Sequence, residues 1–101
     1  MTTNRHGWHP ETTLVHSGTT RSPYGETSEA MYLTQGFVYA TAEAAEARFN
    51  GDDPGFVYSR YANPTVAMFE TRIAALEGAE AARATASGMA AVTLALKACC
   101  K

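Results

Sequence analysis

The chain has no long apolar segment, no cluster of basic residues and only two cysteines. Its longest apolar stretch, near the C-terminus, is far shorter than the roughly 20 residues that span a bilayer. The polar residues at its start do not resemble a signal peptide. A formal net charge of −2 without a Lys/Arg cluster argues against binding to nucleic acid or to an anionic membrane. These absences predict a cytoplasmic protein that binds neither nucleic acid nor membranes.

Cysteine and histidine indicate neither a disulfide nor a metal site. Cys99 and Cys100 are adjacent, which places them poorly for an ordinary disulfide and favours a reducing compartment. The pair is expected to fill small apolar positions on a buried helix. The histidines His6, His9 and His16 lie in a polar stretch with no cysteine partner and no helix to fix their spacing. No metal site is therefore predicted.

At 101 residues the chain is one small domain at most, and 46% apolar residues argue against disorder. Residues 1–30 are rich in Thr, Ser and Gly without a clear period, so they predict an irregular arm that is ordered only against another surface. Residues 31–39 predict an extended segment with a bend or bulge at Gly36. Residues 81–86 are small and mostly apolar, as in a buried strand.

Capping residues predict where helices begin and end. Thr41 can cap a helix over about residues 42–49, which Asn50-Gly51 can end in a left-handed conformation. The following Asp52-Asp53 pair belongs to a Pro- and Gly-rich turn and is interpreted as turn chemistry rather than a catalytic dyad.

A second helix is predicted after residue 63. Asn63 can cap it, Pro64 suits its first position, and Gly78 stands where a C-terminal cap belongs. Apolar residues recur at three- and four-residue spacing and form one stripe, made of Val66, Phe69, Ile73 and Leu76.

A third helix is predicted from near Ser87, and it is apolar on nearly all sides, so we expect it to be buried in a larger body. It opens with the motif Ser87-Gly88-Met89-Ala90-Ala91. A strand–turn–helix junction exposes backbone N–H groups at a helix N-terminus, where they favour an anion. Gly88 would let the backbone approach a ligand, and the Ser87 hydroxyl could cap the helix or donate to a phosphate oxygen. A junction that binds nothing remains the alternative, and neither a P-loop nor a G-x-G-x-x-G motif is present.

A second candidate anion site lies in Tyr58-Ser59-Arg60-Tyr61-Ala62-Asn63-Pro64-Thr65. The planar guanidinium of Arg60 suits bidentate phosphate contacts, and the Tyr58 hydroxyl can add a neutral donor. The alternative is a surface arginine that pairs with Asp52, Asp53 or Glu70.

Together, the two motifs resemble the transsulfuration family of pyridoxal-phosphate enzymes, over the region from about Thr12 to Leu96. That family includes cystathionine γ-synthase, cystathionine lyases, methionine γ-lyase and the homoserine-ester sulfhydrylases. Three further features look like its O-succinylhomoserine sulfhydrylase branch: residues 25–30, residues 51–56, and Tyr61 within the first motif.

The resemblance implies an α/β fold that is incomplete as given. It would comprise an N-terminal arm plus the start of the large cofactor-binding domain of a fold-type I pyridoxal-phosphate enzyme. Residues 1–50 would form the arm and first helix, and residues 51–101 the beginning of the cofactor-binding domain. Members of the family are tetramers built from two dimers, in which the arm of one subunit lies across a neighbour. The resemblance implies the same assembly for this chain.

The resemblance also implies the cofactor, pyridoxal phosphate, and the residues that bind it. Tyr58 and Arg60 would contact the cofactor phosphate held by the neighbouring subunit. Gly88 and Met89 would offer backbone N–H groups to the phosphate of the chain's own cofactor, with Ser87 opening that turn.

No catalytic residue is assigned within the chain. In similar enzymes the catalytic lysine, the aromatic residue stacked on the cofactor ring and the aspartate at the ring nitrogen would all lie beyond residue 101. Lys97 and Lys101, the only lysines, are not in the family's catalytic-lysine context. The implied activity is the replacement of succinate by sulfide on O-succinylhomoserine to give homocysteine, with the chain inactive alone. The alternatives are a cystathionine γ-synthase or methionine γ-lyase, and a non-catalytic fragment that docks on full-length subunits.

Overall fold

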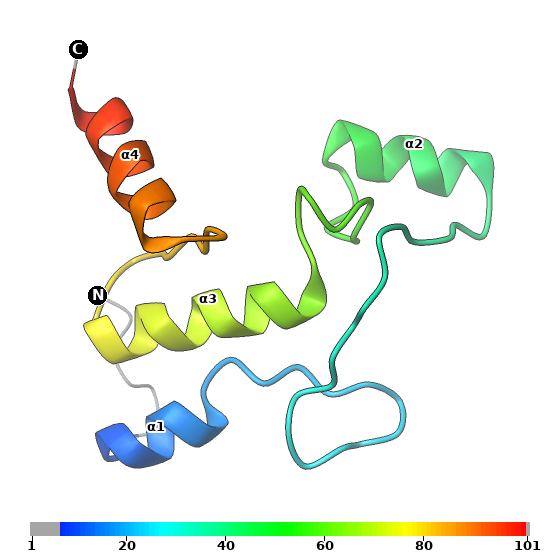
Figure 1. Cartoon of the computed structure of the whole chain (residues 1–101). Coiled ribbons are helices and arrows are strands. Elements are labelled where there is room, and N and C mark those ends of the chain that lie inside the picture. Colours follow the sequence, from blue (N-terminus) through cyan, green and yellow to red (C-terminus); the bar gives the residue numbers. More distant parts are fainter. Residues whose placement is uncertain (1–6, 101) are drawn as a thin grey trace.

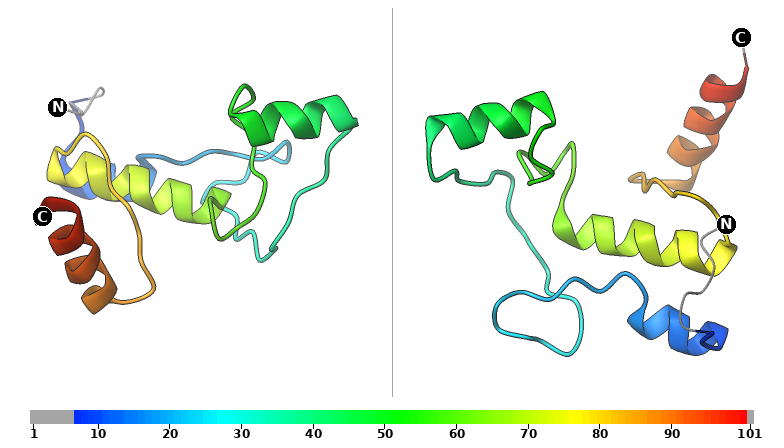
Figure 2. Two further views of the ribbon diagram at one scale, coloured as in Figure 1. Left: turned by 90° about the horizontal axis from the view of Figure 1, so that it is seen from above. Right: turned by 180° about the vertical axis from the view of Figure 1, so that it is seen from behind.

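The computed structural model describes residues 7–100, which form an open arrangement of helices joined by long irregular segments (Figure 1). The Cα radius of gyration is 15.8 Å, larger than the roughly 13 Å of a compact 100-residue domain. The helices are α1 (Pro10–His16), α2 (Ala42–Asn50), α3 (Pro64–Glu77) and α4 (Gly88–Cys99). Views from above and behind show α1 beside α3, with α2 and α4 set apart (Figure 2).

Helix α1 corrects the prediction of a wholly irregular arm. Pro10 occupies the first turn, Glu11 lies near the positive end and His16 lies in the last turn, which together suit a short helix. A helix this short is stabilised mainly by packing against α3 rather than by its own sequence, and Thr13 is buried. After α1 the arm is irregular, as predicted, and it first follows α3 and then forms a wide loop before the extended segment (Figure 1).

The segment at 31–39, predicted to be extended, is non-helical and contains an isolated antiparallel bridge between Gly36 and Tyr58. Its bend lies at Gln35, one residue before the predicted Gly36. The buried strand predicted at residues 81–86 is wrong, because this segment has no regular structure and is largely exposed. A strand needs a neighbour to complete its hydrogen bonds, and no segment among residues 7–100 pairs with it.

Helix α2 is confirmed at both ends. The Thr41 hydroxyl accepts a hydrogen bond from the Ala44 N–H at 3.1 Å. Gly51 follows the helix with a φ of 85°, in the left-handed region that favours glycine. In the turn beyond it, Asp53 forms an ion pair with Arg48 at 3.0 Å.

Helix α3 also has its predicted ends, with Asn63 as N-cap and Gly78, at a φ of 64°, as C-cap. Its buried residues are Met68 and Ala74 rather than the predicted apolar stripe. Val66, Phe69 and Leu76 of that stripe are exposed, and Ile73 is half-buried. The stripe is therefore not the face of α3 that the rest of the described chain covers.

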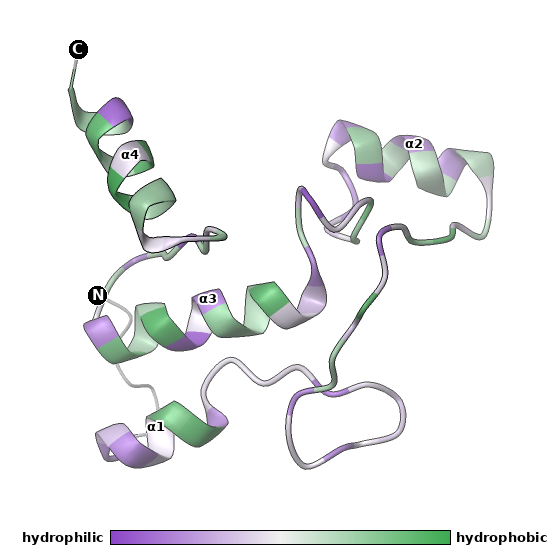
Figure 3. Cartoon of the chain, in the orientation of Figure 1, coloured by the Kyte–Doolittle hydropathy of each residue, from purple (hydrophilic) through white to green (hydrophobic). Residues whose placement is uncertain are grey.

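Helix α4 begins at Gly88, and the Ser87 hydroxyl caps it by accepting from the Ala90 N–H at 3.2 Å. Its apolar composition is evident in Figure 3, and its large side chains, among them Met89, Val92 and Leu94, are all exposed. The expected burial of Cys99 and Cys100 is wrong here, because both are exposed free thiols, at and just after the end of α4, and no other described helix packs on α4. Among residues 7–100, no helix is long and apolar enough to cross a membrane.

Candidate phosphate-binding site

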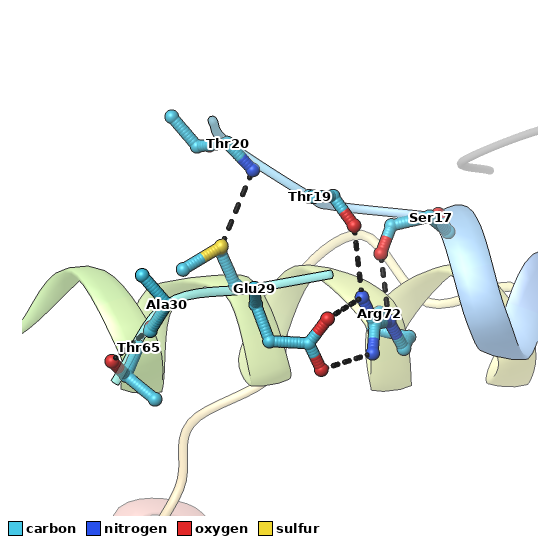
Figure 4. Close-up of polar contacts among 8 residues, drawn as sticks. Ser17, Thr19, Thr20, Glu29, Ala30, Thr65 and Arg72 are labelled. Atoms are coloured by element: carbon cyan, nitrogen blue, oxygen red, sulfur yellow. Dashed lines mark hydrogen bonds and ion pairs between the residues drawn. The ribbon is translucent and has the colours of Figure 1, made fainter. Parts of the chain in front are cut away.

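Arg72, in the middle of α3, fixes the arm along that helix (Figure 4). Its Nε donates to the Ser17 carbonyl at 2.8 Å, and its Nη2 donates to the Thr19 hydroxyl at 3.0 Å. Both carboxylate oxygens of Glu29 accept from its guanidinium, at 2.8 and 3.2 Å. These charge-assisted bonds lower the pKa of Glu29. The arm is therefore ordered against its own chain, a contact that sequence reasoning missed.

A second set of contacts links the arm to the start of α3. The Thr65 hydroxyl accepts from the Tyr32 N–H at 2.9 Å and donates to the Ala30 carbonyl at 3.0 Å. The Asn63 side chain, in addition to capping α3, donates to the Tyr32 carbonyl at 2.9 Å. The residues just before α3, which include the first predicted motif, are thereby placed against the segment that follows the arm.

Arg60 lies between two tyrosine rings. Its guanidinium carbon is 5.5 Å from the ring centroid of Tyr58 and 5.3 Å from that of Tyr61. These distances are within the range of cation–π attraction. The two rings are 6.3 Å apart in an edge-on arrangement. Both aromatic neighbours leave the N–H groups of Arg60 available to an anion, because a ring face accepts no conventional hydrogen bond.

The alternative interpretation of Arg60, a pairing with Asp52, Asp53 or Glu70, is wrong. Asp53 pairs with Arg48 at 3.0 Å, and Glu70 pairs with Arg83 at 3.3 Å. Within residues 7–100 Arg60 forms no ion pair of its own. The pKa of Asp53 is lowered mainly by its hydrogen bond from Arg48, so this carboxylate is already satisfied.

Arg60 lines a cavity of about 510 Å³ between the start of α3 and the connection to α4. Arg83 and Thr85 of the α3–α4 connection also line this cavity, whereas Tyr58 and Ser87–Met89 do not. The structure thus brings Arg60 close to the α3–α4 connection without joining the two motifs into one site.

The second motif has the donors that a phosphate requires. The N–H groups of Gly88 and Met89 precede the first intrahelical hydrogen bond, so they are available to a ligand, and the helix dipole favours an anion there. The Ser87 oxygen accepts from Ala90, which leaves its hydroxyl hydrogen to donate. A Cβ at Gly88 would meet no atom within 4 Å, so there is open space beside this residue. This donor set fits the phosphate of pyridoxal phosphate.

Neither of the two candidate phosphate sites includes Trp8, Lys97 or the described histidines, His9 and His16. Residues 7–100 contain no cluster of three His, Cys, Asp or Glu side chains that could hold a metal ion. His6 lies outside the described residues. The ring of Trp8 packs edge-on against His16, at 5.8 Å between centroids. Lys97 lies in the exposed last turn of α4.

Comparison with known proteins decides the family. The sequence model for "Cys/Met metabolism PLP-dependent enzyme" matches residues 11–101. The chain belongs to this family. Pyridoxal phosphate is the family's cofactor, in agreement with the resemblance of the two motifs.

Two kinds of relative illustrate the match. The chain is 58% identical, over 82 residues, to the O-succinylhomoserine sulfhydrylase of Pseudomonas aeruginosa. The aligned region covers 81% of this chain and 20% of that enzyme. It is 43% identical, also over 82 residues, to an L-methionine gamma-lyase of Fusobacterium nucleatum, covering 81% of this chain and 21% of that enzyme. The chain therefore spans about a fifth of the length of these relatives.

A solved structure confirms the predicted fold class. A candidate O-acetylhomoserine (thiol)-lyase from Campylobacter jejuni, determined with a pyridoxyl-lysine phosphate group, matches with a TM-score of 0.83 and 32% identity. The match covers 90% of this chain and 22% of that chain. The fold is thus the N-terminal arm and the start of the large domain of a fold-type I pyridoxal-phosphate enzyme. The boundary between residues 50 and 51 stays a prediction.

Proposed function

We propose that the chain is the N-terminal part of a pyridoxal-phosphate-dependent O-succinylhomoserine sulfhydrylase. Such an enzyme replaces the succinate of O-succinylhomoserine by sulfide and forms homocysteine. The observation that carries the proposal is the 58% identity to a sulfhydrylase, against 43% to a methionine gamma-lyase over the same number of residues, 82. Cystathionine γ-synthase and methionine γ-lyase are the competing activities, and a cytoplasmic location stays a prediction.

The role proposed for these residues is to hold phosphate. Gly88 and Met89 would donate backbone N–H groups at the start of α4, and Ser87 would add its hydroxyl. Arg60 and Tyr58 would donate side-chain N–H and O–H groups to a phosphate held by a second subunit. When bound, pyridoxal phosphate supplies the electron sink that stabilises negative charge at the substrate carbon.

A homotetramer built as a dimer of dimers, with active sites shared between subunits, is part of the proposal. Its support is that Arg60 lines a cavity that none of residues 87–89 line. A shared site explains why one chain carries two sets of phosphate donors that it does not bring together. The small-molecule substrate would then bind between subunits.

The 101-residue chain alone is proposed to be inactive, because Lys97 and Lys101 are its only lysines. Lys97 lies on the exposed face of α4, more than two helical turns from the donors at Gly88 and Met89. The covalent step of the family's chemistry needs an activated lysine at the cofactor. A fragment that only docks on complete subunits is a second candidate, favoured by the exposed apolar surface of α4.

The test uses the natural gene product. Native mass spectrometry should give a tetramer of subunits far heavier than 10.8 kDa, each with one pyridoxal phosphate. Homocysteine should form from O-succinylhomoserine and sulfide, faster than cystathionine forms with cysteine in place of sulfide. Preferred use of cysteine would identify a cystathionine γ-synthase, and efficient breakdown of methionine a γ-lyase. A 10.8-kDa species without cofactor would favour the docking fragment.

A further inference from the structure

Asn63 does more than cap α3. The residue is buried, at 7% exposure, and all polar groups of its side chain form hydrogen bonds. The Oδ1 atom accepts from the Thr65 N–H at 2.9 Å, which is the cap itself. The Nδ2 group donates to the Tyr32 carbonyl and to the Ser59 hydroxyl, both at 2.9 Å. The amide orientation is determined, because the Thr65 N–H can only donate and must face the oxygen.

Ser59, the residue directly before Arg60, is held on its other side by the extended segment. Its N–H donates to the Gln35 carbonyl at 2.9 Å, and its hydroxyl donates to the Thr34 carbonyl. The bridge between Gly36 and Tyr58 adds a further link between the same two stretches. The backbone that carries Arg60 is thus fixed to residues 34–36 on one side and to Asn63 on the other.

Capping alone does not account for these contacts. A helix cap needs only a side-chain oxygen, and aspartate caps a helix as well as asparagine does. The Nδ2 group is needed only for the bonds to Tyr32 and Ser59, neither of which belongs to α3. The two functions of the side chain reside on different atoms and can be separated by substitution.

We infer that Asn63 is a positioning residue for the phosphate contact of Arg60, acting through Ser59. The inference rests on the phosphate role proposed above for Arg60. Fixing Ser59 sets the point from which the Arg60 side chain starts. Because charge-assisted hydrogen bonds depend strongly on geometry, a loosened Ser59 weakens the bond from Arg60 to phosphate.

The test is Asn63→Asp, which keeps the cap oxygen and replaces the donor by an acceptor facing the Tyr32 carbonyl. Affinities for pyridoxal phosphate and for phosphate-free pyridoxal are measured by absorbance titration of the apo form of the full natural gene product. The dissociation constant for pyridoxal phosphate should rise about tenfold, as loss of one charge-assisted bond predicts. The dissociation constant for phosphate-free pyridoxal should change less than about twofold.

Arg60→Ala and the double variant complete the experiment. Arg60→Ala should show the same phosphate-selective loss, and adding Asn63→Asp to it should cause no further loss, because both act on one contact. Thr41→Ala removes the equivalent cap of α2 and should leave both affinities unchanged.

The outcomes separate the two proposals. If Arg60→Ala lowers phosphate-selective affinity but Asn63→Asp does not, Asn63 is not a positioning residue and the proposed role of Arg60 stands. An equal loss of both ligands in Asn63→Asp shows a general structural effect and also overturns the inference. If Arg60→Ala has no effect, the phosphate role of Arg60 fails and the inference fails with it.

Should Asn63→Asp fail to fold, Ser59→Ala decides. This variant removes the hydroxyl that Asn63 donates to and leaves the cap of α3 in place. A phosphate-selective loss supports the inference, whereas unchanged affinity for both ligands overturns it.

Discussion

Helices α3 and α4 begin in the same way but lie in different environments. Each starts from a side chain that caps its first turn, Asn63 for α3 and Ser87 for α4. The arm covers the face of α3 that contains Met68, which is 3% exposed. Helix α4 has no buried residue. Local capping is therefore enough to specify where both helices begin, whereas burial depends on a partner surface, which for α3 is the chain's own arm.

The contact between the arm and α3 is made largely of polar groups. Arg72 donates to the arm at Ser17, Thr19 and Glu29, and the Thr20 N–H lies 3.2 Å from the Met68 sulfur. Such contacts fix position more than they add stability, because each replaces a hydrogen bond to water. Substitution of a few of these residues should therefore be enough to release the arm from α3.

The largest effect is expected for Gly18→Ala. Gly18 has a φ of 76°, and a Cβ there would lie 2.9 Å from the Met68 carbonyl oxygen, a backbone atom that cannot move aside. We expect the free energy of unfolding, measured by urea titration, to fall by about 2 kcal/mol. Gly25→Ala is the matched control, since Gly25 also has a positive φ, 67°, but no atom within 4 Å of the added carbon. Equal losses in the two variants would show that backbone strain, and not contact with α3, governs the effect.

Arg72→Met should have the next largest effect. Methionine keeps the apolar stem of this side chain, which is 14% exposed, and loses the bonds to Ser17 and Thr19. We expect the free energy of unfolding to fall by about 1–2 kcal/mol. Hydrogen exchange at the Thr20 N–H should become faster. The control is Arg83→Met, whose arginine is 85% exposed and should contribute less than about 0.5 kcal/mol. Similar losses in both variants would contradict a special role for Arg72.

Acid should loosen the arm before it affects α4. The pKa of Glu29 is lowered from its ordinary value of 4.5, chiefly by the hydrogen bonds from Arg72. A carboxyl whose pKa is lower in the folded state stabilises the fold above the unfolded pKa. That stabilisation is lost as the pH falls from 4.5 through the folded pKa. Unfolding free energies measured between pH 7 and pH 3 should decline in this window, and Glu29→Gln should reduce the decline. An unchanged decline in Glu29→Gln would assign it to other carboxyls.

The parts of the fold that local sequence determines were predictable. The caps at Thr41, Asn63 and Ser87 each use a side chain that bonds within its own first turn, so a short stretch of sequence contains both partners. The strand predicted at residues 81–86 does not form in the described chain, since a strand depends on neighbours distant in sequence, which a short stretch of sequence does not reveal. Helix α1 escaped notice because seven residues are too few to show a period, although Pro10 and Glu11 mark its start.

The candidate site also has residues that the sequence could identify and a residue whose proposed role emerges only in the folded structure. Tyr58, Arg60 and the Ser87–Met89 turn could be selected from the sequence, because motifs of those residue types resemble those of a family. The second role proposed for Asn63 could not, since a capping asparagine has the same sequence pattern whether or not its Nδ2 finds partners. Those partners, Tyr32 and Ser59, come together only in the folded chain.

The smallest effect on stability is expected for Gly88→Ala in α4, which is the counterpart of Gly18→Ala in the arm beside α3. Gly88 has no positive φ, and a Cβ there meets no atom within 4 Å. The free energy of unfolding should change by less than about 0.5 kcal/mol, because Gly88 is the first residue of α4 and the preference for alanine over glycine applies in full only in a helix interior. Affinity for pyridoxal phosphate, titrated against the apo form of the natural gene product, should nevertheless fall, since the added carbon stands beside the N–H groups that we propose to bind the phosphate. An unchanged affinity would mean that the open space at Gly88 serves no ligand, and that the second motif is only the start of a helix.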